Sequence, residues 1–210
     1  NEIAQNQAHS CSDASGARIW MHNNFLIERS GKMSKSSGEF LRVQLLIDKG
    51  YHPLAYRLMC LQAHYRSELE FSWEGLGAAL TRLKRMVMAV SQLVEHTDRA
   101  SDFRLLDGFT KKVLEDVEAA IYQDLATPKA LAAFELLALQ GYPKFAPAVA
   151  NDEAAKQGIC NARLDAIETL DQVFGLNLSE LSRTELRIRP KAATITEAEI
   201  EAALARRKEA

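Results

Sequence analysis

The sequence lacks any apolar run long enough to cross a bilayer, and its first residues lack the basic-then-apolar pattern of a signal peptide. It contains no internal repeat and only three cysteines, Cys11, Cys60 and Cys160, among 210 residues. An odd number of widely spaced cysteines argues against a disulfide framework and favours a reducing compartment. We therefore predict a cytoplasmic protein that does not associate with membranes.

Charge is unevenly distributed along the chain, although the net charge is only −2. Residues 29–66 contain seven basic residues against two acidic ones, a local excess of five positive charges. The basic residues are Arg29, Lys32, Lys35, Arg42, Lys49, Arg57 and Arg66. The residues after position 66 have the opposite balance, 18 basic against 23 acidic. A positive block suits an anionic substrate, and the alternative is a solvated basic face.

The stretch Gly31–Gly38 is the most informative part of this basic block. It holds two lysines, Lys32 and Lys35, and three serines between its terminal glycines. Glycine lets the main chain approach a ligand closely, and lysine supplies a compact ammonium donor. The apolar residues that follow predict a helix, whose N-terminus would attract anions. The stretch predicts a polyphosphate-binding loop; from composition alone, the alternative is a solvated turn.

The order of residues in and around this stretch matches four known motifs. Lys32–Ser36 reads K-M-S-K-S, the signature of class I aminoacyl-tRNA synthetases. Trp20–Leu26 reads W-M-H-N-N-F-L, His64–Ser67 reads H-Y-R-S, and Asn1–Gln5 reads N-E-I-A-Q. In this order and at this spacing, the motifs resemble those of cysteinyl-tRNA synthetases.

The resemblance is densest over residues 1–72 and continues through Leu125–Leu131 to the end of the chain. Two departures stand out. Asn24 replaces the usual glycine of the W-M-H-N-G-F-L motif, and Ser37-Gly38-Glu39 replaces L-G-N after the signature. Because Glu39 adds a negative charge beside the expected phosphate site, it puts nucleotide affinity in doubt more than it does the fold.

The resemblance implies a two-step reaction in which cysteine and ATP form cysteinyl-adenylate before the acyl group passes to tRNA(Cys). The substrates implied are cysteine, tRNA(Cys) and ATP, the last as its Mg complex, and the implied state is a monomer. Lys32, Met33, Ser34, Lys35 and Ser36 then form the ATP-binding signature. Within it, Lys35 is the principal catalytic contact to the phosphates and Lys32 assists.

The resemblance also implies a zinc site. Its motif places a zinc-binding glutamate on Glu2, while the family's other ligands, two Cys and one His, fall upstream of this chain. His9 and Cys11 lie close in sequence, but a lone H-x-C pair indicates a surface loop more than a metal site. The chain lacks an initiator Met and begins inside a motif. We therefore expect a piece of a longer protein, with zinc in the intact protein only.

The expected fold is mainly α. Ala17–Arg29 predicts buried strands. The resemblance implies that they end a class I, Rossmann-type α/β catalytic domain carrying the signature loop. From residue 40 onward the apolar spacing predicts helices only, the later ones forming an antiparallel bundle. Ser72, Thr127 and Thr196 are predicted helix caps.

The resemblance implies four segments. Residues 1–40 end the catalytic domain, and residues 41–72 form a connecting, stem-contact-like helical segment. Residues 73–176 form an anticodon-side bundle. Residues 177–210 form a linker and the first helix of a truncated C-terminal module.

Arg57, Tyr65 and Arg66 are candidate tRNA contacts. Arginine and tyrosine at a helix end contact phosphates in nucleic-acid complexes, and they equally often cap carbonyls and pack. Both alternatives stay open. Arg82, Lys84 and Arg85 lie off the apolar seam of their helix, and either form a solvated face or contact the tRNA backbone.

Two other functions remain open. Cysteine ligases of mycothiol synthesis share the signature but join cysteine to an amino sugar; the helix expected at 195–210, which resembles the opening of the synthetases' last domain, argues against them. The second alternative is a non-catalytic tRNA-binding module. We expect this chain alone to be inactive, because the upstream half of the active site is not in it.

Overall fold

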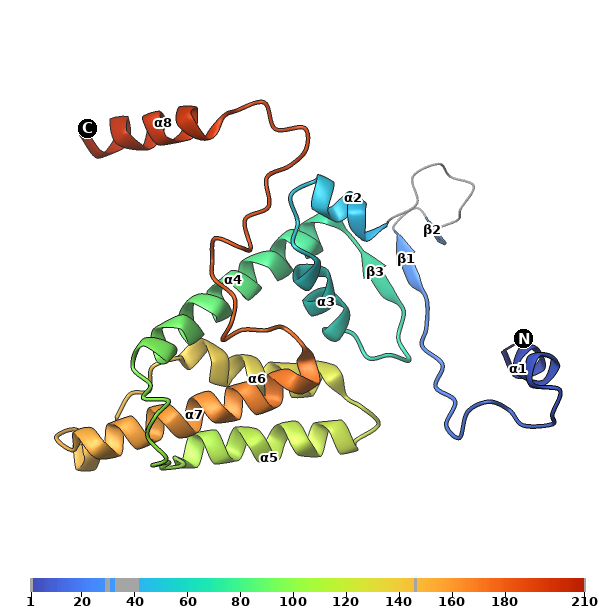
Figure 1. Cartoon of the computed structure of the whole chain (residues 1–210), viewed down its shortest axis with the longest axis horizontal. Helices are drawn as coiled ribbons and strands as arrows, with labels where there is room; N and C mark the ends of the chain where they lie inside the picture. The colour runs from blue at the N-terminus through green and yellow to red at the C-terminus, as the bar shows by residue number, and fades with distance from the viewer. Residues whose placement is uncertain (1, 29–30, 33–41, 146, 210) are drawn as a thin grey trace.

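The computed structural model describes residues 2–28, 31–32, 42–145 and 147–209. Its elements are a small sheet, two short helices beside the sheet, four long packed helices, and one helix near each end of the chain (Figure 1). The mainly helical fold expected from the sequence is confirmed. No helix in the described part of the chain has the length and apolarity that crossing a membrane requires.

The sheet has three short strands in the order β2-β1-β3. The strands are β1 (Leu26–Glu28), β2 (Gly31–Lys32) and β3 (Leu69–Phe71). β1 pairs antiparallel with β2 and parallel with β3, so that Ile27 lies opposite both Lys32 and Glu70. A parallel pair needs a crossover connection, and here the connection contains α2 and α3.

The crossover helices are α2 (Val43–Asp48) and α3 (Pro53–Leu61). Pro53 opens α3, where its missing N–H donor leaves no hydrogen bond unmade, and Nδ1 of His52 accepts a hydrogen bond from the Leu54 amide at 3.2 Å. α3 buries Ala55, Leu58 and Met59 against the rest of the molecule. It thereby packs against α4, the first long helix.

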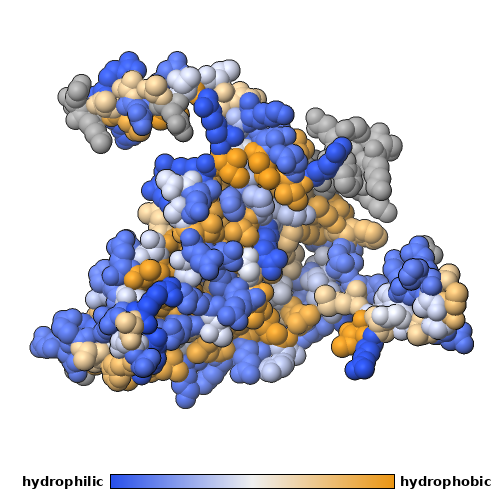
Figure 2. All heavy atoms as spheres, viewed as in Figure 1, coloured by the Kyte–Doolittle hydropathy of each residue, from blue (hydrophilic) through white to orange (hydrophobic). Residues whose placement is uncertain are grey.

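The four long helices pack on one another around a shared core. They are α4 (Trp73–Glu95), α5 (Gly108–Tyr122), α6 (Thr127–Gln140) and α7 (Glu153–Phe174), with the short 3-10 helix η2 (Pro147–Val149) before α7. Phe134 of α6 stacks on Phe174 of α7 with ring centroids 4.7 Å apart. The seam predicted along α4 is confirmed at Leu76, Leu83, Val87 and Val90, all fully buried. Hydrophilic residues dominate the visible surface of α5, α7 and α8 (Figure 2).

Capping side chains mark the starts of several helices. Ser72 accepts a hydrogen bond from the Gly75 amide at 3.0 Å, as predicted. Thr196 and Glu199 form a reciprocal capping box at the start of α8 (Glu197–Glu209). The cap predicted at Thr127 is off by one residue, because α6 begins at Thr127 itself and Ala126 is the cap.

The strand prediction for Ala17–Arg29 is confirmed at β1 and wrong before it, and the prediction of helices only after residue 40 is wrong at β3. Residues 17–25 form no strand, and Ile19 and Met21 are 86% and 59% exposed instead of buried. The described residues offer this apolar run no neighbouring strand, and an unpaired strand is not stable. Conversely, β3 lies in a region where the sequence predicted helices only. It forms because β1 supplies a parallel partner.

Both ends of the described chain extend away from the packed body (Figure 1). The helix α1 (Glu2–Ser10) buries none of its residues. The helix α8 is likewise exposed over residues 198–207. The body that positions any site therefore comprises the sheet and α2 to α7.

Candidate functional site

The β1–β2 hairpin carries the first residue of the K-M-S-K-S signature. The backbone of Lys32 pairs with Ile27 in the sheet, and β1 is fixed on its other side by β3. The remaining signature residues, Met33, Ser34, Lys35 and Ser36, lie outside the described residues, as do Ser37 and Glu39. The structure therefore describes the strand pairing that holds the first residue of the signature, Lys32.

Asn24 ties the beginning of β1 to the turn after α3. Its backbone N–H donates to the Tyr65 carbonyl at 2.7 Å, and its side-chain Nδ2 donates to the Arg66 carbonyl at 3.1 Å. Its Oδ1 accepts from the Phe25 amide at 2.8 Å. A glycine at this position, as in the family motif, would keep the first bond and lose both side-chain bonds. The departure noted in the sequence thus adds one hydrogen bond to the H-Y-R-S turn and one within the segment that leads into β1.

The side chains of the H-Y-R-S turn converge on Asp124, at the corner between α5 and α6. Arg66 donates from Nε to Oδ2 at 2.9 Å and from a terminal nitrogen to Oδ1 at 3.1 Å, and the Tyr65 hydroxyl donates to Oδ1 at 2.7 Å. His64 Nε2 lies 2.9 Å from the Asp124 carbonyl oxygen. The hydrogen bonds from Arg66 and Tyr65 lower the pKa of Asp124, and the hydrogen bond to Asp124 raises the pKa of Tyr65. We call these four residues the corner latch.

The corner itself has an unusual backbone. Asp124 and Leu125 adopt left-handed φ angles of 53° and 50°. Aspartate tolerates this conformation better than most residues, which favours its choice at the first of the two positions. Thr127 adds a hydrogen bond from Oγ1 to the Ala63 carbonyl at 3.3 Å. The sequence resemblance reached this corner through Leu125–Leu131, but it did not single out Asp124.

Arg57 is engaged at the end of α7. Its Nε donates to the Phe174 carbonyl at 2.5 Å, satisfying one of the carbonyls that a helix end leaves without a partner. Gly175 follows in the left-handed region at φ 63°, and a Cβ there would lie 2.9 Å from the Arg57 guanidinium. Arg57, Tyr65 and Arg66 therefore all make contacts within the protein. Their assignment to tRNA stays a prediction.

The residues present do not fit a zinc centre by themselves. Glu2, the ligand implied by the resemblance, lies on the exposed helix α1. Cys11 is exposed after the same helix, with its Sγ 3.8 Å from the Ala8 carbonyl. Within the described ranges, no three His, Cys, Asp or Glu side chains lie close enough together to hold a metal ion. The role of Glu2 stays a prediction.

A group of three basic side chains lies where α4 meets the segment after α7. The pKa of Lys84 is lowered mainly by burial and also by the nearby positive charges of Arg187 and Arg183. None of these three has a salt bridge among the described residues. Arg82, two residues away in α4, is instead paired with Glu135 through two hydrogen bonds. We call Lys84, Arg183 and Arg187 the basic cluster.

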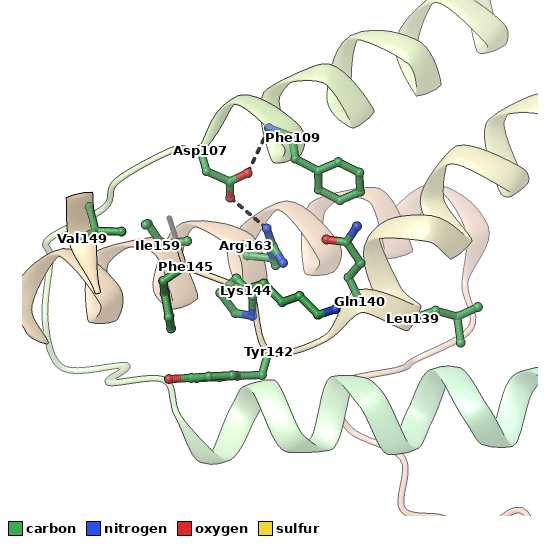
Figure 3. A pocket seen from close by; sticks show the side chains of 11 residues that line it. Asp107, Phe109, Leu139, Gln140, Tyr142, Lys144, Phe145, Val149, Ile159 and Arg163 are labelled. Carbon is green, nitrogen blue, oxygen red and sulfur yellow. Dashed lines mark hydrogen bonds and ion pairs between the residues drawn. The ribbon is translucent and has the colours of Figure 1, made fainter. Parts of the chain in front are cut away.

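A cavity of about 710 Å³ opens at the far end of the long helices, between the start of α5, the end of α6 and α7 (Figure 3). Arg163 and Asp107 point toward each other at its base, with a terminal guanidinium nitrogen 3.1 Å from Oδ2. The side chain of Arg163 is only 4% exposed and that of Asp107 23%. Phe109, Tyr142 and Phe145 supply aromatic walls. Sequence reasoning missed this pair, because its members lie 56 residues apart in the chain.

Comparison with known proteins gives consistent matches. Residues 1–81 match the family described as tRNA synthetases class I (C) catalytic domain. A cysteine–tRNA ligase of Novosphingobium aromaticivorans is 60% identical over 100% of this chain and 40% of its own length. A cysteine–tRNA ligase of Zymomonas mobilis is 42% identical over 99% of this chain and 43% of its own. A third, from Treponema denticola, is 28% identical over 89% of this chain and 38% of its own.

The chain thus spans about four-tenths of the length of the curated relatives it matches. The matches cover the sheet, the corner latch and the long helices alike, since two of them run over practically the whole chain. On these grounds the chain belongs to the cysteine–tRNA ligase family of class I aminoacyl-tRNA synthetases.

Proposed function

We propose that this chain forms part of a cytoplasmic, ATP-dependent enzyme that ligates cysteine to tRNA(Cys). The observation that carries the proposal is the 60% identity, over the whole chain, to a protein named cysteine–tRNA ligase. The unsubstituted K-M-S-K-S sequence at the β1–β2 hairpin supports it. We propose that the 210 residues alone are inactive, because the family's zinc ligands other than Glu2 are not among them.

The proposed reaction has two steps. A cysteine carboxylate oxygen attacks the α-phosphorus of ATP, forming a P–O bond while the bond to pyrophosphate breaks. The terminal ribose hydroxyl of the tRNA then attacks the carbonyl carbon of the adenylate, and AMP leaves with the electrons of the broken C–O bond. Negative charge builds on pyrophosphate in the first step, so cations placed there accelerate it by binding the transition state more tightly than the substrate.

We assign this cationic role to the signature lysines. Lys35 is the principal contact to the departing pyrophosphate, and Lys32 assists from the end of β2. Met33, Ser34 and Ser36, the other residues of the signature, set the shape of the ATP-binding loop. The pairing of β2 with β1, and of β1 with β3, supports a fixed starting point for this segment.

We assign the docking of tRNA to the helical part. We interpret the four long helices as the antiparallel anticodon-side bundle over residues 73–176. The basic cluster lies where Lys84 of α4 meets Arg183 and Arg187 of the segment after α7. Cations without internal partners are available to phosphates, which contribute most of the affinity in nucleic-acid binding. Arg57, Tyr65 and Arg66 have internal partners, so we give Lys84, Arg183 and Arg187 precedence as phosphate contacts.

The decisive experiment is cysteine-dependent ATP–pyrophosphate exchange by the full-length protein. We expect Lys35→Ala to slow exchange at least about a hundredfold, as loss of one preorganised donor to a developing anion typically does. Cysteine binding should survive. The matched control is Lys112→Ala, which removes an exposed lysine of α5 that pairs with Asp116 on the same helix.

Three outcomes separate the alternatives. Exchange together with charging of tRNA supports the ligase. Exchange together with transfer of cysteine to an amino sugar, and no charging, would instead identify the mycothiol-type ligase. Binding of tRNA without any exchange in the full-length protein would leave only a docking module.

A further inference from the structure

We propose that Asp124 is a positioning residue that couples the helical bundle to the signature hairpin through the corner latch. The inference rests on the proposed function and deepens it, because it assigns a path between the tRNA-docking helices and the nucleotide end of the molecule. The path runs from the α5–α6 corner, through the H-Y-R-S turn, to the first residues of β1.

The first step of the path is polar and continuous. Asp124 accepts hydrogen bonds from both Tyr65 and Arg66, the latter in a two-point arrangement that fixes orientation as well as distance. The backbone carbonyls of these same two residues accept from Asn24, one from its amide and one from its side chain. A displacement of the corner therefore acts on the same two residues that hold the start of β1.

The second step is a short backbone segment. Asn24 lies two residues before β1, whose Ile27 pairs with Lys32 of the signature. The Phe25 carbonyl also accepts from the Leu69 amide at 3.0 Å, which joins the segment to β3. The segment before β1 is thus held by the H-Y-R-S turn, and β1 itself is held by β3.

The latch is placed at the surface. The side chain of Asp124 is 51% exposed and that of Arg66 65%. Exposed ion pairs contribute little to global stability, because water and salt compete for both partners. Three hydrogen bonds to one exposed carboxylate fix the relative position of the corner and the H-Y-R-S turn. Breaking them should change the free energy of unfolding little. These are properties expected of a contact that positions two parts of an enzyme.

Asp124→Asn is the informative substitution. Asparagine also tolerates the left-handed conformation, so the corner is preserved, but the charge and one acceptor oxygen are lost. In the full-length ligase we expect exchange without tRNA to stay within about twofold of wild type. Single-turnover transfer of cysteine from preformed adenylate to bound tRNA should fall about fivefold, the lower end of typical coupling between sites. The dissociation constant for tRNA and the melting temperature should not change.

Asn24→Gly provides a second, independent entry into the path. It removes the bond from Nδ2 to the Arg66 carbonyl and the bond from the Phe25 amide to Oδ1, and leaves the backbone bond to Tyr65. We expect a smaller loss of transfer in the same direction, about twofold. The double variant should lose less than the product of the two single losses, because both act on one path. Asp116→Asn, which removes an exposed carboxylate from α5, the helix before the corner, should behave as wild type.

The outcomes are distinguishable. Transfer by Asp124→Asn at the wild-type rate, an equal loss in exchange and transfer, or a clearly lowered melting temperature would each overturn the proposal. A wild-type protein that does not charge tRNA overturns the proposed function. A wild-type protein that charges tRNA, beside an Asp124 variant that is indifferent, overturns the coupling alone.

Discussion

Among single residues, Asp107 makes the most demanding set of contacts. One of its oxygens accepts from the Phe109 and Thr110 amides, capping α5, while the other accepts from the Thr110 hydroxyl and from Arg163. Burial raises the pKa of Asp107, but the hydrogen bonds from Thr110 and the charge of Arg163 outweigh burial and leave the pKa below its ordinary value. Arg163 is nearly inaccessible to water and depends on this carboxylate.

We therefore expect Asp107→Asn to destabilise the protein by about 2–3 kcal/mol at pH 7. Breaking a fully buried pair typically costs about 3–5 kcal/mol, and Asp107 keeps some access to solvent. Because its folded-state pKa lies below the unfolded value, its contribution is present above that value and is lost as pH falls through the folded pKa. Urea unfolding at several pH values should show a constant difference between wild type and variant from pH 7 to about pH 5, shrinking below about pH 4. A difference that grows on acidification would contradict this assignment.

At the scale of elements, the contact between α4 and the end of α6 depends on one glycine. Gly141 has a left-handed φ of 49°, and a Cβ there would lie 2.4 Å from the backbone carbonyl oxygen of Ala89. The obstructing atom belongs to the main chain of α4, so it cannot move without moving the helix. Gly77, within α4, has nothing within 4 Å of its Cβ position.

The two glycines predict opposite effects of alanine. Gly141→Ala should destabilise the protein by about 2 kcal/mol or more, from backbone strain and from the separation of α4 and α6. Gly77→Ala should stabilise it by about 0.5–1 kcal/mol, because alanine loses less backbone entropy in a helix interior. Thermal denaturation of both variants provides the comparison. Equal effects would mean that the close approach at Ala89 carries no strain.

The long helices were the most predictable elements. Their apolar residues recur every three to four positions, and local signals such as Ser72 and Gly175 mark their ends. The sheet was less predictable. β3 is only three residues long and exists through a parallel partner about 40 residues earlier, which no local pattern encodes. The run at Ile19–Met21 has the apolar character of a buried strand, but here it lies exposed.

The candidate site was predictable only where its residues are contiguous in the sequence. A linear motif identifies Lys32–Ser36 and His64–Ser67, because its residues are contiguous. It does not show what the motif contacts. Asp124 lies 58 residues from Arg66, and the left-handed corner that presents it has no glycine to mark it. Arg82 and Lys84 were indistinguishable in sequence, and only the position of Glu135 separates them.

At the scale of the whole molecule, folding brings three basic residues together within the part of the chain that has a net negative charge. Lys84 belongs to α4 and the other two members of the basic cluster to the segment after α7, so this group forms only when the chain is folded. The neighbouring Arg82 is occupied by Glu135. Among the described residues, an anionic partner thus meets basic side chains of two kinds: those paired with a carboxylate, such as Arg82, and those without a salt bridge, such as the basic cluster.

We expect this difference to appear in the salt dependence of tRNA binding. Replacing Lys84 and Arg187 by alanine in the full-length protein should weaken binding. It should also reduce the slope of log K against log salt by about one for each phosphate that the variant no longer neutralises. Arg82→Ala should leave the slope unchanged. Filter binding over a range of salt concentrations measures both, and an unchanged slope in the double variant would remove the basic cluster from the tRNA interface.

The bond from Arg57 to the Phe174 carbonyl joins residues 117 positions apart. While a ribosome is making the protein, the guanidinium emerges long before its acceptor. At about 5–20 residues per second, the delay amounts to roughly 6–23 s. During that interval α3 can already pack against α4, but its anchor to the end of α7 is missing, so this joint between the two ends of the body is among the last to be completed during synthesis.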